Sequence, residues 1–129
     1  MKIGILCYPT FGGSGVVATE LGKSLSEKGN IIHFISYAQP ARLNLFSDNL
    51  FYHEVSVKNY PLFDFPPYET SLTSKLVEIV KFERLDLVHV HYAIPHASAA
   101  ILAKEILKTM HVHIPVSYTH LTLPTNREV

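Results

Sequence analysis

Short apolar runs rich in β-branched residues alternate with amphipathic stretches along most of this 129-residue chain. Such runs predict strands buried in a sheet, and hydrophobic residues spaced three or four apart predict helices. Their alternation predicts an α/β fold, a Rossmann-like parallel sheet with helices on both faces and right-handed crossovers. The length suits one such domain. The expected strands are 2–7, 31–36, 51–57, 86–91 and 112–116, and the expected helices are one closed by Gly29, then 68–84 and 95–110.

A glycine-rich loop, Gly12-Gly13-Ser14-Gly15, joins the first expected strand to the first expected helix. Glycines let backbone N–H groups approach a ligand closely, and the N-terminus of a helix favours a negative charge. The loop is therefore a candidate site for a phosphate or diphosphate, although a plain tight turn would use the same residues. Its spacing is not the dinucleotide-binding pattern G-x-G-x-x-G, and no Walker lysine follows. A ligand here would lie beyond the carboxyl ends of the strands.

Histidines gather at the end of the fourth expected strand, in the segment HVHYAIPH. His89 and His91 share one face of that strand because side chains alternate, and Tyr92 and His96 follow near its carboxyl end. His91 or Tyr92 could donate a hydrogen bond to an anionic substrate, or the histidines could be bonded within the core. A metal site is a third interpretation, but the sequence supplies no evident cysteine or carboxylate partner, so we expect no metal. Further histidines open to such a site are His111 and His113.

The charge of the chain is balanced, with 11 basic and 11 acidic residues. No basic excess indicates a nucleic acid or an anionic membrane as partner. No segment approaches the ~20 apolar residues of a membrane span, and the apolar start of the chain is too short for a secretory signal. We therefore expect a cytoplasmic protein. Its one cysteine, Cys7, lies in an apolar run, which favours a small buried side chain over a reactive thiol.

Four segments, in the expected order, resemble glycosyltransferase family 4, and within it the bacillithiol-biosynthesis enzymes that act on L-malate. The resemblance covers residues 1 to about 115. It implies the truncated N-terminal domain of a GT-B glycosyltransferase, on the acceptor side, without the C-terminal domain that grips the nucleotide. The matching segments are 7–22 (CYPTFGGSGVVATELG), 33–36 (HFIS), 65–68 (FPPY) and 89–97 (HVHYAIPHA).

The resemblance also implies an activity, a retaining and metal-independent transfer of N-acetylglucosamine from UDP-N-acetylglucosamine to L-malate. The family's glycine-rich loop reaches toward the donor diphosphate, a role that maps onto Gly12 to Gly15. The tyrosine that helps to bind the acceptor maps onto Tyr92, and His91 is a second acceptor-binding candidate. No catalytic residue is assigned, no cofactor is implied, and a homo-oligomer is left open. Without the nucleotide-binding domain, we expect the chain alone to be inactive.

Residues 116–125 (VSYTHLTLPT) depart from the family pattern, which continues with a Thr-Leu-His-Gly-Thr loop. They match the one-frame translation of a transposase adapter used to build sequencing libraries. We therefore expect a native domain over 1–115 and a non-native tail over 116–129, and we do not equate His120 with the family's histidine. Two alternatives to a malate-specific enzyme stay open. One is a family 4 transferase with another acceptor, and the other is a stand-alone phosphate- or nucleotide-binding module.

Overall fold

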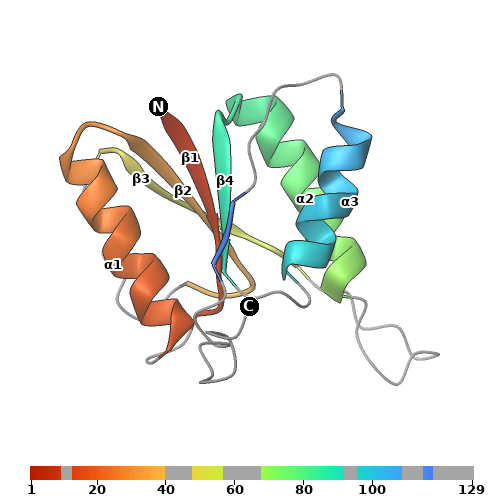
Figure 1. Ribbon diagram of the computed structural model, residues 1–129, viewed down its shortest axis with the longest axis horizontal. Coiled ribbons are helices and arrows are strands. Elements are labelled where there is room, and N and C mark those ends of the chain that lie inside the picture. Colours follow the sequence, from red (N-terminus) through yellow and green to blue (C-terminus); the bar gives the residue numbers. More distant parts are fainter. Residues whose placement is uncertain (10–12, 40–47, 57–67, 92–95, 109–114, 118–129) are drawn as a thin grey trace, which may run out of the picture.

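A computed structural model describes residues 1–9, 13–39, 48–56, 68–91, 96–108 and 115–117. Strands and helices mostly alternate in this part of the chain, as the sequence predicted (Figure 1). In chain order the elements are β1 (Lys2–Leu6), α1 (Ser14–Glu27), β2 (Ile31–Ser36), β3 (Leu50–Glu54), α2 (Tyr68–Glu83), β4 (Leu87–His91), α3 (Ser98–Ile106) and β5 (Val116–Ser117). None of the described helices has the length and apolar character needed to cross a bilayer.

The described strands form one five-stranded sheet in the order β3-β2-β1-β4-β5, and every pairing is parallel. α1 covers one face of this sheet, and α2 and α3 cover the other (Figure 1). The expected Rossmann-like arrangement with helices on both faces is thereby confirmed. The chain winds outward from β1 through β2 and β3, and then returns to place β4 on the other side of β1. Ligands of open parallel sheets bind at such a switch point, beyond the carboxyl ends of the strands.

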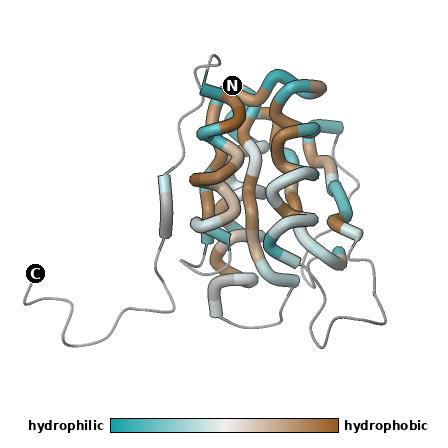
Figure 2. Tube along the Cα trace, turned by 90° about the vertical axis from the view of Figure 1, so that its right-hand side faces the viewer, coloured by the Kyte–Doolittle hydropathy of each residue, from teal (hydrophilic) through white to brown (hydrophobic). Residues whose placement is uncertain are grey.

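Each face of the sheet has its own hydrophobic core. Ile5 and Phe34 pack beneath α1, whereas Leu6, Ile35 and Val90 pack with α2 and α3. Successive residues of a strand therefore point to opposite cores, as the geometry of a pleated strand requires. Figure 2 shows hydrophobic residues along the middle of the packed elements and hydrophilic residues at several of their ends. This alternation determines which face of the sheet each polar strand residue occupies.

The C-terminal end of α1 is closed by a glycine, as predicted. Gly29 has a φ of +93°, a left-handed conformation. Its N–H donates to the Ser26 carbonyl at 3.0 Å, and the Asn30 N–H donates to the Leu25 carbonyl at 3.2 Å. These two bonds are those of a Schellman motif, in which a glycine satisfies the last carbonyls of a helix. The position favours glycine because a Cβ would strain this backbone conformation.

The middle of α1 lies directly on the sheet at Gly22. A Cβ added at this position would overlap the Phe34 ring and come within 3.1 Å of the Ile5 side chain. The helix therefore meets β2 through its backbone at this point. Close packing of this kind leaves no room for adjustment, since protein interiors are packed as densely as organic crystals. Gly22 thus sets the distance between α1 and the sheet.

Several boundaries differ from the sequence-based expectation, those of β1, α2 and β4 by one residue and those of β3, α3 and β5 by more. β3 begins at Leu50 and ends at Glu54, and β5 consists only of Val116 and Ser117. α3 begins at Ser98 and follows a π-type turn at residues 96–97, whereas Pro95, the expected start, lies outside the described residues. The His96 side chain at this turn bonds through its Nδ1 to the His91 carbonyl.

Candidate functional site

The glycine-rich loop lies between β1 and the N-terminus of α1 (Figure 1). Gly13 caps the helix with φ +60° and ψ −137°, a conformation that residues with a side chain rarely adopt. The first helical bond is donated by the Val17 N–H to the Gly13 carbonyl at 3.3 Å, so the N–H groups before it have no partner inside the helix. Within the described chain, the first turn carries no acidic residue. An anion is therefore the fitting partner for this helix end.

The four predicted diphosphate-binding residues fall at different places around this helix end. Gly13 is the capping residue, and Ser14 is the first residue of α1. Gly15 is buried in the first turn, where its carbonyl accepts a 2.8 Å hydrogen bond from the Thr19 hydroxyl. Gly12 lies outside the described residues. The described part of the loop thus has the geometry of a helix N-terminus with glycines on both sides of its first residue.

Two buried side chains near this helix end have unpaired polar atoms. The ring nitrogens of His91 and the hydroxyl of Ser36 have no hydrogen-bond partner within the described structure, and both side chains are fully buried. His91 ends β4 and Ser36 ends β2, and both share the face of α1 because their neighbours Val90 and Ile35 point into the opposite core. The N-terminus of α1 lies at the same edge of the sheet (Figure 1). A buried polar group without a partner costs about 1–3 kcal/mol, so a ligand that supplies partners here would gain binding energy.

The imidazole of His91 is neutral at physiological pH. Burial, together with the neighbouring His89 and His96, lowers the pKa of His91 to about 4. A neutral imidazole offers one hydrogen-bond donor and one acceptor, a combination that suits a hydroxyl or carboxylate group of a ligand. The His89 and His91 rings lie 4.6 Å apart, which confirms that they share a face. Among the described residues, no third metal ligand joins this pair.

A cluster of aromatic rings lies at the same edge of the sheet, on the face of α2 and α3. Tyr8 follows β1, Tyr37 follows β2, Tyr68 begins α2, and His96 precedes α3. The Tyr8 and His96 ring centroids are 4.4 Å apart. Tyr37 meets Tyr8 at 6.2 Å and Tyr68 at 5.7 Å, both edge to face, a geometry worth about 0.5–1.5 kcal/mol per pair. This aromatic cluster ties together the ends of four elements.

Hydrogen bonds determine which nitrogen of His96 carries the proton. Its Nδ1 lies 2.8 Å from the His91 carbonyl oxygen, which can only accept, so Nδ1 carries the hydrogen. Burial lowers the pKa of His96 to about 4, so Nε2 is left as an acceptor. The Tyr68 hydroxyl donates to Nε2 at 3.0 Å, and burial raises the pKa of Tyr68 and keeps it a donor. Both nitrogens of His96 are therefore occupied, and its role is structural.

The remaining predictions have mixed outcomes. Cys7 is buried, as expected, and burial raises the pKa of its thiol to about 12, which makes it unreactive at neutral pH. Tyr92, onto which the acceptor-binding tyrosine of the family maps, lies outside the described residues. The sequence did not point to Ser36 or Tyr37. The alternation of β2 places Ser36 with Phe34 on the face of α1, but it does not show that the Ser36 hydroxyl lacks a partner.

Comparison with known proteins separates this chain from others that share its fold. The model of Glycosyltransferase Family 4 matches residues 11–126, most of the chain. The chain belongs to glycosyltransferase family 4. A curated relative is N-acetyl-alpha-D-glucosaminyl L-malate synthase from Bacillus anthracis, with 55% identity over 107 residues, which cover 83% of this chain and 28% of the relative. The chain thus spans little more than a quarter of that relative's length.

Solved structures confirm the fold of this family 4 chain. A glycosyltransferase from Rickettsia africae is similar over 92% of this chain and 29% of its own length, with a TM-score of 0.62 and 19% identity. This likeness supports the predicted half of a GT-B fold. The C-terminal domain of a hydrogenase from Pyrococcus furiosus is similar over 91% of both chains, with a TM-score of 0.57 and 19% identity. A fold shared with a hydrogenase says nothing about the reaction, which must be argued from the site.

Proposed function

We propose that the protein containing this chain transfers N-acetylglucosamine from UDP-N-acetylglucosamine to L-malate. The 55% identity to a synthase named for that product supports the substrates. The structural observation that carries the proposal is a coincidence at one edge of the sheet. The N-terminus of α1 lies there on the same face as the unpaired polar atoms of His91 and Ser36. The anionic groups of the two substrates would satisfy both features, the donor diphosphate at the helix and the acceptor carboxylate at His91.

The glycine-rich loop, Gly12 to Gly15, is proposed to meet the diphosphate of the donor. Backbone N–H groups at the start of α1 donate to its phosphate oxygens, and the helix dipole favours their charge. Negative charge builds up on the departing UDP during the transfer, so donors fixed in advance stabilise the transition state more than the ground state. The left-handed backbone of Gly13 is what aims these donors. In this proposal the chain contributes the positioning of the donor and electrostatic stabilisation, and no residue acts as a general base.

The carboxyl end of β4 is proposed to meet the acceptor. His91 is neutral because of its low pKa. Its single N–H can therefore donate a hydrogen bond to a carboxylate of L-malate. A ligand that covers the end of β4 supplies the partner that His91 lacks. Tyr92, the next residue in the chain, is proposed as the second acceptor contact. The site therefore combines a neutral donor on β4 with the positive end of α1.

Two glycine substitutions test the donor part of the proposal in the protein that contains this chain. Gly13 and Gly29 both have positive φ, and neither has an atom within 4 Å of an added Cβ. Alanine therefore strains the backbone at either position, but only Gly13 is at the site. We expect Gly13→Ala to lower kcat/KM for UDP release with L-malate by about 10- to 100-fold. Gly29→Ala should lower Tm and leave kcat/KM unchanged.

Equal activity of the two alanine variants would contradict the role of the loop. The acceptor is tested separately, by measuring UDP release with L-malate and with other hydroxy acids. If UDP-N-acetylglucosamine is consumed with a different alcohol and not with L-malate, the proposed acceptor is wrong, while the assignment to the family still holds. Tight binding of a phosphate or nucleotide with no turnover of any acceptor would instead support a binding module.

We also propose that residues 1–115 are the native part of the chain and that residues 116–129 are adapter-derived. The basis is the codon-by-codon match described above. Two observations bear on it from the other side, because β5 pairs with β4 through Val116 and Ser117 and the family model extends to residue 126. Genomic sequence across the codon for Pro115 decides the matter. A native reading frame that encodes VSYTHLTLPT would refute the proposal.

A further inference from the structure

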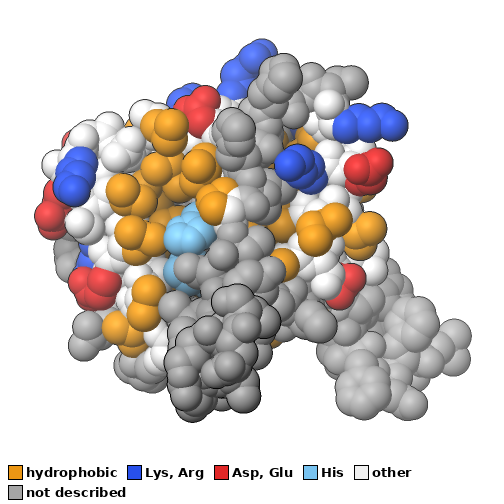
Figure 3. All heavy atoms as spheres, viewed as in Figure 1, with side chains coloured by type: hydrophobic (Ala, Val, Ile, Leu, Met, Phe, Trp, Pro, Cys, Tyr) orange, Lys and Arg blue, Asp and Glu red, His pale blue; other side chains and the backbone are white. Residues whose placement is uncertain are grey.

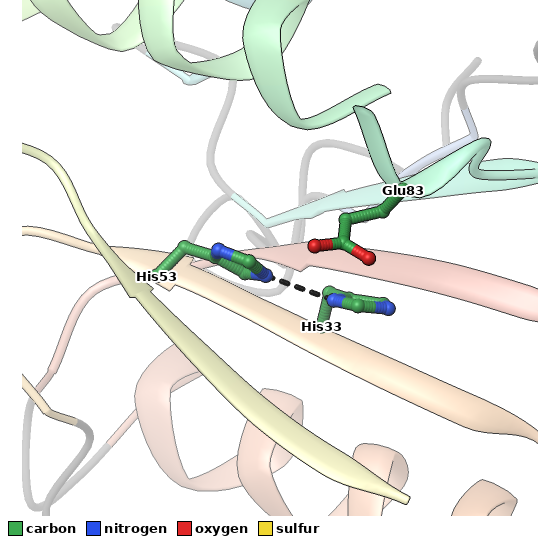
Figure 4. A group of neighbouring side chains, drawn as sticks. All are labelled: His33, His53 and Glu83. Atoms are coloured by element: carbon green, nitrogen blue, oxygen red, sulfur yellow. Dashed lines mark hydrogen bonds between the residues drawn. The ribbon is translucent and has the colours of Figure 1, made fainter. Parts of the chain in front are cut away.

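A second polar cluster lies on the face of the sheet opposite to α1 (Figure 4). His33 comes from β2, His53 from β3, and Glu83 from the last residue of α2. The His33 Nδ1 and His53 Nε2 atoms are 2.8 Å apart. One side-chain nitrogen or oxygen from each of the three residues lies within 4.8 Å of the others. None of these residues belongs to the site proposed for the transfer reaction.

The parallel register of β2 and β3 brings the two histidines together. His33 is paired with Phe51, and His53 is paired with Ile35, so the histidines are diagonal neighbours on one face. Side chains in this relation are within reach of each other when they are aromatic. The Phe51 ring stacks on His33 with 5.1 Å between centroids and an interplanar angle of 15°. This stacking fixes the plane of the His33 ring, and with it the direction of its nitrogens.

Glu83 is held over the histidines by the way α2 ends. Arg84 has a φ of +54°, and the Leu85 N–H donates to the Val80 carbonyl at 3.3 Å. This bond closes the helix as a glycine cap would, although a side chain costs energy in this conformation. Leu85 is buried in the core of α2 and α3, so the turn is anchored. The carboxylate therefore faces the histidines from a fixed helix end (Figure 4).

The two imidazoles already face each other through one nitrogen each, since His33 Nδ1 and His53 Nε2 lie 2.8 Å apart. Two nitrogens at this distance can share one proton, and a metal ion is the other partner that suits two imidazoles.

We propose that His33, His53 and Glu83 form a binding site for a divalent transition metal ion of the zinc class. Two imidazoles and one carboxylate, with a fourth position left to water, are a ligand set that zinc accepts. Tetrahedral geometry with Zn–N distances of about 2.0–2.1 Å requires nitrogens roughly 3.3 Å apart, so the two rings need to separate only slightly. The C-terminus of α2 adds the negative end of a helix dipole, which favours a cation.

The bound ion joins three elements that are distant in sequence. It links β3, at the edge of the sheet, to β2 and to the end of α2. Because a preformed site exists only in the folded state, binding stabilises the fold by mass action. The cluster is half-buried, with His33 3% exposed and with the other two residues partly accessible, which leaves a path for entry from solvent.

The test is a metal titration of the purified protein that contains this chain, after treatment with a chelator. Zn²⁺ is added in competition with a chromophoric chelator, and Co²⁺ is added in a parallel experiment to record its visible absorption. We expect one tight site per chain, a tetrahedral-type Co²⁺ spectrum, and a Tm that rises by several degrees with Zn²⁺. We expect His53→Gln and Glu83→Gln to weaken binding by about 10- to 100-fold, as loss of a metal-site group does.

Glu78→Gln is the matched control for Glu83→Gln. It removes the same charge from the same helix, and its carboxylate is exposed and pairs with Lys75 at 3.7 Å. This variant should bind Zn²⁺ as the unaltered chain does. Equal affinity in all three variants would place the metal on other histidines and overturn the proposal. If the unaltered chain does not bind Zn²⁺ and its Tm does not change, the two histidines only share a proton and the proposal is wrong. If His53→Gln does not fold, as circular dichroism would reveal, Glu83→Gln decides alone.

Discussion

His91 and His96 lie five residues apart and are equally buried, yet their surroundings differ in one decisive respect. Both side chains are fully buried, and both have pKa values lowered to about 4. The nitrogens of His96 bond to Tyr68 and to the His91 carbonyl. The nitrogens of His91 have no partner among the described residues. Burial and pKa are therefore the same at both positions, and only hydrogen bonding separates them.

This difference distinguishes a histidine that holds the fold from one that is available to a ligand. His96 lies within the aromatic cluster and joins the end of β4 to the beginning of α2 and α3. His91 lies on the other face of the sheet, at the edge where α1 begins. A search for functional histidines by burial or by shifted pKa would choose both. Stability and binding measurements can test whether the two histidines differ in this way.

The largest expected effect is common to both histidines and depends on pH. Unfolded histidines take up protons near pH 6.5, whereas His91 and His96 in the folded chain do so only near pH 4. The unfolded state binds more protons between these values, so the free energy of unfolding falls as pH is lowered from about 6.5 to about 4. Each histidine contributes a slope of about 1.4 kcal/mol per pH unit. Urea denaturation at several pH values measures it, and a stability that is flat across this window would contradict the burial of both rings.

The next effect in size separates the two histidines. His96→Ala removes both hydrogen bonds and the ring contact with Tyr8, and it leaves the Tyr68 hydroxyl without its acceptor. We expect the free energy of unfolding to fall by about 3 kcal/mol, measured by urea denaturation at pH 7.5. His89→Ala, at a partly exposed position of β4, is the control and should cost clearly less. Similar losses in the two variants would mean that the bonds of His96 add nothing.

Tyr68→Phe should have a smaller effect of the same kind. It removes the hydrogen bond from the Tyr68 hydroxyl to His96 Nε2, at a cost of about 1–2 kcal/mol. Tyr37→Phe makes the same chemical change in the same aromatic cluster, at a side chain that is 45% exposed. We expect that control to change stability by less than about 0.5 kcal/mol. If both variants unfold at the same urea concentration, the hydrogen bond between Tyr68 and His96 adds nothing to the stability of the fold.

The smallest change in stability is expected for His91→Leu. This substitution removes two buried nitrogens that already lack partners, so the free energy of unfolding should change by less than about 1 kcal/mol in either direction. The same variant in the protein that contains this chain should bind the acceptor less well, which a rise in KM would show. A loss as large as that of His96→Ala would mean that His91 is bonded in solution, and the two histidines would then be equivalent.

Local sequence patterns predicted the framework of this fold well. The alternation of apolar runs predicted the order of strands and helices, and Gly29 marked the end of α1. The pleat of a strand placed His89 and His91 on one face, as observed. Such predictions succeed because each depends on a few neighbouring residues and on the period of the element. The start of α3 was predicted too early, because the structure has a π-type turn at residues 96–97 before the helix begins at Ser98.

The polar sites were harder to predict because they join residues from different elements. His33 and His53 meet only through the register of two parallel strands, and Glu83 reaches them from the end of a distant helix. Parallel pairing has no short-range signature, since the paired strands are joined by a long connection. Ser36 was missed for a related reason, because a single serine at the end of a strand carries no signal until its lack of a partner is seen.

Gly22 has a consequence for engineering this domain. The residue lies far along α1 from the glycine-rich loop, yet its close contact with the Phe34 ring determines the distance between the helix and the sheet. A larger side chain at this position would push α1 away from the sheet, and the N-terminal end of the helix at Gly13 would move with it. A glycine-rich loop grafted from a relative would therefore keep the position of its backbone N–H groups only in a domain that also has a glycine at position 22.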